Sequence, residues 1–348
     1  MYKKLILISL LVVFFSCSKD NSIANNNVIL TNNLPGTIYF YFTGSYGLID
    51  FKAGSYVKEY ANRKLKGYSI GSIYISHTGK NALIVSEKFS QFGYDAQRID
   101  YRPLESSTPD LDDGKSIYGF VYRFGDIALG SGTWSLISPN EKFVAIDANS
   151  FAKHPIVLVD AKTGEVIESF RADNVDLRKH SIIDWTNDNS LFMNIGGDIF
   201  KVNASDNWEP QPLIHIESEG SVAVNRQGTK LVFRGTNKHL FLYDLRNGQI
   251  KQITTGKTDN SLPDGERLPE FSPDGNYIAF STKSTIAAQS WENPIDGSVT
   301  GVSSEFGYLA IIPADGKLYD LDNTNNGVIY PRSSKTKLIA VDGKFYWR

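Results

Sequence analysis

Short apolar runs separated by turn-forming residues recur along most of this chain, and each pair of runs predicts a β-hairpin. The clearest example is LPEFSPDGNYIAFST at residues 268–282. Pro273 fixes φ near the value that a tight turn requires, Asp274 can hydrogen-bond to nearby backbone, and Gly275 can adopt a positive φ without steric cost. The apolar run after the turn is typical of a strand that is buried on both faces.

The same pattern of strand, turn and strand recurs at intervals of roughly 40 to 60 residues, the range in which sequence repeats indicate propeller blades or similar arrays. The further copies are SIYISHTGKNALIVSE (72–87), WSLISPNEKFVAIDAN (134–149), SIIDWTNDNSLFMNI (181–195), SVAVNRQGTKLVFRG (221–235) and a degenerate one, VIYPRSSKTKLIAVDG (328–343).

A second type of hairpin follows these copies, clearest in PIVLVDAKTGEVIESF (155–170) and HLFLYDLRNGQIKQIT (239–254), with variants at 198–213 and 308–321. Its last strand alternates in polarity, which indicates an outer strand with one exposed face. Each unit therefore predicts a four-stranded antiparallel sheet with two buried inner strands. Such sheets bury their faces by radial stacking, so we expect an all-β fold, a β-propeller.

The chain ends predict how the ring closes. A hairpin of the second type at 46–60 has no first-type hairpin before it, and the first-type hairpin at 328–343 is followed only by KFYWR (344–348). These two halves would form one blade shared between both ends of the chain, which removes a free sheet edge. We expect six blades over residues 37–348, or seven if TIYFYF (37–42) and KFYWR form a further shared blade.

At 268–282 and 240–254 the chain resembles a known repeat. The FSPDG-x-x-IAF hairpin and the LFLYDL hairpin with its Gly turn look like the TolB-type, WD40-like propeller repeat. The resemblance covers residues 37–348 and implies a propeller of a kind known as a protein-interaction platform. The same repeat is found in prolyl oligopeptidases and oligogalacturonate lyases, so it implies no single activity.

The N-terminus has the features of an export signal. Lys3 and Lys4 precede an apolar run at 5–15, which is too short to span a bilayer comfortably. The residues VFFSC resemble the cleavage box of bacterial lipoproteins, whose cysteine becomes lipidated, and Cys17 is the sole cysteine. The alternative is an ordinary secretory signal that contains a cysteine. We expect a signal peptide at 1–16 and a lipidated, flexible tether at 17–36.

The leader and the amino-acid composition together indicate where the protein is located. The Asn-, Lys- and Tyr-rich sequence resembles lipoproteins of the Bacteroidota, so we expect an outer-membrane lipoprotein anchored through Cys17. In that group an acidic run after the cysteine is associated with surface export, and here only Asp20 is acidic. Both the cell surface and the periplasmic face stay open. The formal net charge of −2 gives no reason to expect a nucleic-acid partner.

One catalytic pattern occurs, G-x-S-x-G at 67–71. It requires a strained strand-to-helix turn and a histidine base, whereas here it precedes a propeller hairpin, so we interpret it as a chance match and assign no catalytic residue. The five histidines show no metal-ligand spacing. His180 opens an expected inner strand and could face a central channel, although a solvated or hydrogen-bonded histidine is the more common case.

Two acidic loops partly match a calcium-binding pattern, through Asp110 and Asp112 in the first and Asp322 and Asn326 in the second. Neither loop has an acidic residue at the twelfth position, and turns use the same residue types for backbone reasons. We therefore predict no metal and no cofactor.

Two connections, 103–132 and 283–306, are longer than a blade requires, and long loops are often functional. The second contains Trp291 and Asn293, which could contact a protein partner or a sugar ring. Alternatively, Trp291 packs over its own blade.

Two functions from different classes follow. The first is a non-enzymatic, outer-membrane-anchored module that binds an envelope protein or acts as a scaffold. The alternative is a carbohydrate-active propeller, either a glycan-binding lipoprotein or a metal-dependent lyase.

Overall fold

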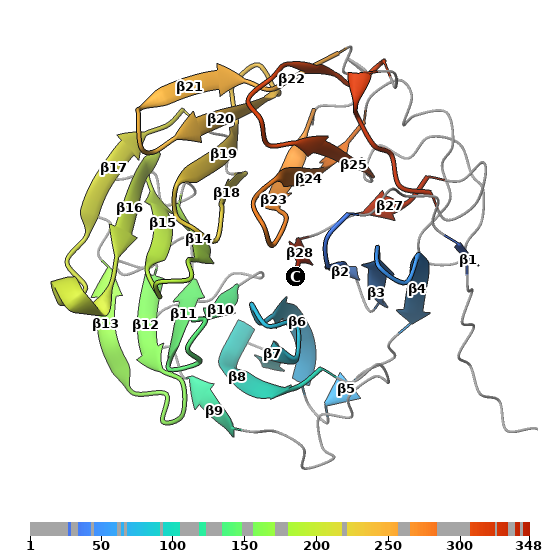
Figure 1. Ribbon diagram of the computed structural model, residues 1–348. Coiled ribbons are helices and arrows are strands. Elements are labelled where there is room, and N and C mark those ends of the chain that lie inside the picture. Colours follow the sequence, from blue (N-terminus) through green and yellow to red (C-terminus); the bar gives the residue numbers. More distant parts are fainter. Residues whose placement is uncertain are drawn as a thin grey trace, which may run out of the picture.

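The computed structural model shows an all-β ring of six antiparallel blades, a β-propeller (Figure 1). The sequence prediction of a six-bladed propeller is confirmed. Helical structure among the described residues is confined to short 3₁₀ turns, such as η1 (Ala204–Asp206). The structure describes residues 27–28, 34–42, 45–60, 64–65, 68–90, 93–104, 118–122, 134–147, 156–170, 180–217, 221–256, 265–283, 307–323, 326–332, 338–341 and 344–348.

The blades follow one another along the chain, and each is written here from its inner strand outward. Blade 1 contains β6 (Tyr68–Ile75), β7 (Asn81–Ser90), β8 (Gly93–Pro103) and β9 (Tyr118–Tyr122), with β5 (Lys64–Leu65) added beside β6. Blade 2 contains β10 (Ser135–Ile137), β11 (Phe143–Asp147), β12 (Ile156–Asp160) and β13 (Val166–Phe170). Blade 3 contains β14 (His180–Trp185), β15 (Leu191–Ile195), β16 (Asp198–Val202) and β17 (Gln211–His215).

The remaining blades have less regular connections. Blade 4 contains β18 (Val222–Val224), β19 (Lys230–Arg234), β20 (Leu240–Asp244) and β21 (Gln249–Gln252). Blade 5 contains β23 (Arg267–Phe271), β24 (Tyr277–Thr282), β25 (Gly307–Pro313) and β27 (Ala340–Val341). Blade 6 contains β28 (Phe345–Trp347), β2 (Thr37–Phe42), β3 (Ser45–Asp50) and β4 (Ser55–Tyr60), with β1 (Asn27–Val28) outside. A short parallel pair, β22 (Thr254–Thr255) and β26 (Tyr319–Asp320), links blades 4 and 5.

The turn between the first two strands of a blade is held by a repeated side-chain bond. In blade 5 the Ser272 hydroxyl accepts the Tyr277 N–H at 2.9 Å and donates to Asp274 Oδ1 at 2.6 Å. Gly275 completes the turn with φ of 74°. Blade 2 repeats these bonds at Ser138. The recurrent motif is thus a turn-closing device, as the sequence predicts. We call these segments the first turns; in blades 1 to 5 they are residues 76–80, 138–142, 186–190, 225–229 and 272–276.

Burial falls from the ring centre outward. Every residue of β15 is buried, whereas β13 exposes Val166 and Ile167. The core lies between neighbouring blades: Trp185 of blade 3 packs near Phe143 of blade 2 and donates its indole N–H to the Leu136 carbonyl at 3.2 Å. Adjacent blades are therefore fixed to each other by large, fully buried side chains, each of which contributes about 2 to 3 kcal/mol through burial.

Ring closure differs from the sequence prediction in one respect. Blade 6 is shared between the chain ends, but its inner strand is β28, which pairs with β2 through Ile38 and Trp347. The prediction that the hairpin at 328–343 supplies this inner half is wrong, because β27 within it pairs with β25 as the outer strand of blade 5. The stretches TIYFYF and KFYWR belong to the sixth blade and do not form a seventh.

The variant second-type hairpin at 308–321 is also corrected. Its first half is β25, but its second half, β26, pairs in parallel with β22 of blade 4 instead of folding back on β25. The Tyr319 N–H donates to the Ile253 carbonyl and the Leu321 N–H to the Thr255 carbonyl. This segment therefore joins two blades, and the outer position in blade 5 passes to β27.

Candidate functional site

The last strand, β28, ends at the centre of the ring. Figure 1 shows the C-terminus there, among the inner strands of the blades. Thr37 and Arg348 exchange two backbone hydrogen bonds there, at 2.6 and 2.8 Å. The pairing of β28 with β2 therefore continues to the final residue and delivers the Arg348 side chain into the middle of the ring.

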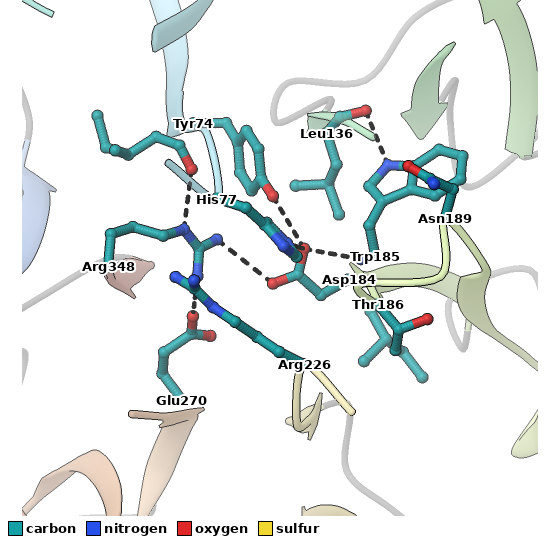
Figure 2. Close-up of polar contacts among 12 residues, drawn as sticks. Tyr74, His77, Leu136, Asp184, Trp185, Thr186, Asn189, Arg226, Glu270 and Arg348 are labelled. Atoms are coloured by element: carbon teal, nitrogen blue, oxygen red, sulfur yellow. Dashed lines mark hydrogen bonds and ion pairs between the residues drawn. The ribbon is translucent and has the colours of Figure 1, made fainter. Parts of the chain in front are cut away.

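Arg348 is the hub of a buried network that connects several blades (Figure 2). Its Nη1 donates to Glu270 Oε1 at 2.8 Å, and its Nη2 lies 3.3 Å from Asp184 Oδ2. Its Nε donates to the Ile75 carbonyl at 3.0 Å. These acceptors lie on β23, β14 and β6, so one guanidinium ties blade 6 to blades 5, 3 and 1.

Asp184 is held as an anion despite its burial. Burial alone would raise the pKa of this carboxyl, but the Arg348 guanidinium outweighs that effect and the resulting pKa is well below its usual range. Oδ1 also accepts the Tyr74 hydroxyl at 3.0 Å and the Trp185 N–H at 2.8 Å. Hydrogen bonds to the ionised form favour it further.

Glu270 behaves differently although it binds the same guanidinium. Burial raises the pKa of this carboxyl to about 7, with Arg348 opposing the rise and the charge of Asp184 adding to it. Arg348, the cation that both buried carboxylates contact, does not stabilise them equally. The pair therefore divides into a permanent anion, Asp184, and a carboxyl that titrates near neutral pH, Glu270.

Two tyrosines enclose the guanidinium. The Arg348 guanidinium carbon lies 5.2 Å from the ring centre of Tyr74 and 5.3 Å from that of Tyr346. The two rings meet edge to face, with centroids 4.9 Å apart. Burial raises the pKa of both hydroxyls well above the usual value, so they stay protonated. The rings and the buried cation thus stabilise one another through cation–π contacts.

His77 lies in the first turn of blade 1, beside this network (Figure 2). His77 is only 8% exposed to solvent, and neither of its ring nitrogens has a hydrogen-bond partner. Nε2 is 3.6 Å from Asp184 Oδ1, which is longer than a hydrogen bond. Burial lowers the pKa of His77, and the neighbouring Asp184 only partly opposes this, so the ring is neutral at pH 7.

Two further cations approach the same region. Arg226, in the first turn of blade 4, is half-buried and donates Nη2 to the Trp347 carbonyl at 3.3 Å. Burial and then the charge of Arg348 lower its pKa to about 10. Lys344, just before β28, lies 3.4 Å from the Ile183 carbonyl, and burial lowers its pKa as well.

The first turns of neighbouring blades are hydrogen-bonded to one another. The Asn140 N–H donates to Asn189 Oδ1 at 2.9 Å, which joins blades 2 and 3. The Asn187 N–H donates to the Arg226 carbonyl at 2.8 Å, which joins blades 3 and 4. These bonds fix the side chains that the turns direct to the ring centre.

The network, as far as the structure describes it, contains none of the residues singled out from the sequence. His180 begins β14, where its backbone pairs with Ile195, and its side chain is outside the described residues. Ser69 of the G-x-S-x-G match lies inside β6 and pairs with Glu87, so it does not have the strand-to-helix turn that the motif requires. Four predicted site residues and the lipidation site lie outside the described residues: Asp110, Asp112, Trp291, Asn293 and Cys17.

The second calcium candidate has turn-type contacts. Asp322 donates its N–H to Asp320 Oδ1, and Asn326 donates its amide to the Asp320 carbonyl, both at 3.1 Å. Across the part of the chain that the structure describes, no group of three His, Cys, Asp or Glu side chains is arranged to hold a metal ion. Two other histidines each bind one carboxylate, His215 with Asp198 and His239 with Glu266.

The sequence analysis did not identify Asp184, Glu270 and Arg348, although the sequence contains a signal for the two carboxylates. Asp184 and Glu270 are charged residues inside runs that were expected to be buried on both faces, and buried charges are rare unless they are paired. Their common partner, Arg348, is a terminal residue that carries no local pattern. Its role depends on ring closure.

Comparison with known proteins supports the fold. No family model matches this sequence, and no curated protein matches it significantly. TolB from Acinetobacter baumannii has a similar structure, with a TM-score of 0.56 and 15% identity over 91% of this chain and 67% of that chain. An oligogalacturonate lyase in complex with manganese gives a TM-score of 0.50 and 12% identity over 72% of this chain and 71% of that one. The shared feature is a TolB-like propeller fold.

No helix among the described residues is long and apolar enough to span a bilayer.

Proposed function

We propose that this TolB-like propeller is a non-enzymatic protein-interaction or scaffold module of the cell envelope, anchored in the outer membrane through a lipid on Cys17. The observation that carries the proposal is the use of the central charges. The donors of Arg348 are directed to acceptors on three other blades, Ile75, Asp184 and Glu270. These bonds connect blade 6 to blades 1, 3 and 5, and a preorganised ring lowers the cost of binding a partner.

The carbohydrate-active alternative has weaker support. The lyase neighbour shares the fold at 12% identity, which carries no activity over to this chain. The described residues offer no set of three metal-ligating side chains, so a manganese-dependent lyase finds no fitting donor set there. Glycan binding through Trp291 stays a prediction.

The test is an affinity purification of the full-length protein from the envelope of its own host after mild cross-linking, with the bound proteins identified by mass spectrometry. We expect one envelope protein in stoichiometric amount. A Cys17→Ser variant is the matched control: it should lose palmitate labelling and membrane association while it keeps the folded propeller. A protein that is recovered alone, and that binds host polysaccharide on an array, would refute the scaffold function in favour of glycan binding.

A further inference from the structure

Arg226 is a cation with most of its hydrogen-bonding capacity unused. A guanidinium carries five N–H donors. Within the described residues, the Arg226 side chain makes one hydrogen bond, to the Trp347 carbonyl, and no ion pair. Asp184 and Glu270, the two carboxylates whose charges act on Arg226, are both bound to Arg348 (Figure 2). The half-buried side chain of Arg226 thus has no carboxylate of its own.

His77 adds a second unsatisfied group at the same place. More than nine-tenths of its surface is buried, and neither ring nitrogen has a hydrogen-bond partner. Burying a polar group without a partner costs about 1 to 3 kcal/mol, so such groups usually mark a bound water, ion or ligand. Both side chains lie beside the Arg348 centre, because Arg226 and Arg348 donate to the same Trp347 carbonyl and His77 lies next to Asp184, which pairs with Arg348.

We propose that the ring centre, on the side of the first turns, binds a carboxylate through the Arg226 guanidinium, next to the His77 ring. The planar fork of a guanidinium matches the two oxygens of a carboxylate. The carboxylate comes either from a small organic acid or from an acidic side chain of a protein.

The surrounding charges favour a carboxylate over a phosphate. Asp184 Oδ1 lies 3.6 Å from His77 Nε2, and Asp184 is firmly ionised. A dianion held between His77 and Arg226 would be repelled by that carboxylate more strongly than a monoanion. One bound monoanion compensates the charge of Arg226. This inference does not depend on the envelope function proposed above.

The first experiment measures thermal unfolding of the whole protein in increasing sodium acetate or sodium propionate, with ionic strength kept constant by sodium chloride. We expect a saturable rise of about 5 °C in the wild type. Arg226→Gln should weaken binding by about tenfold or more. The matched control is Arg246→Gln, which removes an exposed arginine paired with Asp244 and should leave the rise intact. No saturable rise, or an equal rise in Arg226→Gln, would overturn the proposal.

A second measurement avoids the question of whether Arg226→Gln folds. In the wild type, the NMR signals of the His77 ring, assigned with His77→Gln, should shift on addition of acetate and not on addition of chloride. Unmoved signals at saturating acetate would contradict the site. Inorganic phosphate that binds as tightly as acetate would contradict the preference for a monoanion. The peptide acetyl-Gly-Ser-Glu-Ser-Gly-amide tests where the bound carboxylate comes from. If the peptide displaces acetate, the natural ligand is an acidic protein side chain. If the peptide does not compete with acetate, the natural ligand is a small organic acid.

Discussion

At the scale of the residue, the buried pair Asp184 and Glu270 determines how the protein responds to pH. The two carboxylates share the Arg348 guanidinium, and the pKa of Glu270 is raised to about 7 from an ordinary 4.5. Between these values the folded state holds a proton that the unfolded state has released. Stability from this group is therefore fully present below about pH 4.5 and is lost as pH rises to about 7. The folded-state pKa of Asp184 is lowered, so the stability that this carboxylate contributes is present at neutral pH and is lost only as the pH falls into the acid range.

Glu270→Gln tests this assignment, because the amide fills the same space and does not titrate. In the wild type, Glu270 should lower the free energy of unfolding by up to about 1.4 kcal/mol per pH unit between pH 5 and 7. The variant should lack that slope. Urea denaturation at pH 5, 6, 7 and 8 measures it, with the exposed Glu165→Gln as the control. A slope that persists in Glu270→Gln would show that the titrating group is elsewhere.

Arg348→Gln tests the hub itself. It removes the partner of two buried carboxylates, and breaking a buried ion pair on one side typically costs about 3 to 5 kcal/mol. We expect the free energy of unfolding at pH 7 to fall by about that amount. The loss should be smaller at pH 5, where Glu270 is protonated. Arg246→Gln, whose exposed pair with Asp244 is screened by solvent, should change little. Equal stability of Arg348→Gln and wild type would mean that the network is not stabilising.

At the scale of the element, each blade depends on its first turn. The Ser272 hydroxyl is fully buried and both accepts and donates a hydrogen bond, so its loss leaves the Tyr277 N–H unsatisfied. Ser272→Ala should destabilise the protein by about 1 to 2 kcal/mol in chemical denaturation. Thr163→Ala, in an exposed turn of blade 2, should have a smaller effect. Equal effects would indicate that the recurrent serine has no special role.

The extent of sequence prediction also differs from element to element. First turns such as 272–276 could be recognised because local chemistry specifies them. Outer strands of blade 5 could not, because β25 is followed by an irregular stretch and β27 is only two residues long. The inner strand β28 has three residues and pairs with a partner at the other end of the chain. Asp184 and Glu270 could have been noticed as charges in buried runs, but their convergence on Arg348 exists only in the closed ring.

At the scale of the whole molecule, one short strand completes the ring. Trp347 is fully buried in β28, and its indole N–H donates to the Pro35 carbonyl at 2.6 Å. Removal of residues 344–348 would take away this strand together with Arg348. We expect the truncated chain to lose the single cooperative unfolding transition of the wild type in calorimetry. Removal of residues 1–26, the expected signal and part of the tether, should leave the transition unchanged. A cooperative, equally stable truncation would show that β28 is dispensable.

The position of β28 has a consequence for the time course of biosynthesis. A ribosome makes the chain from its N-terminus, so β2 emerges early and its partner β28 emerges after every other strand of the ring. Trp347 and Pro35, which meet in the closed ring, are 312 positions apart in the sequence. Throughout elongation the edge of β2 stays open, and contacts this distant in sequence form slowly. A chain whose translation stops early lacks β28, and its unpaired β2 edge is prone to aggregate.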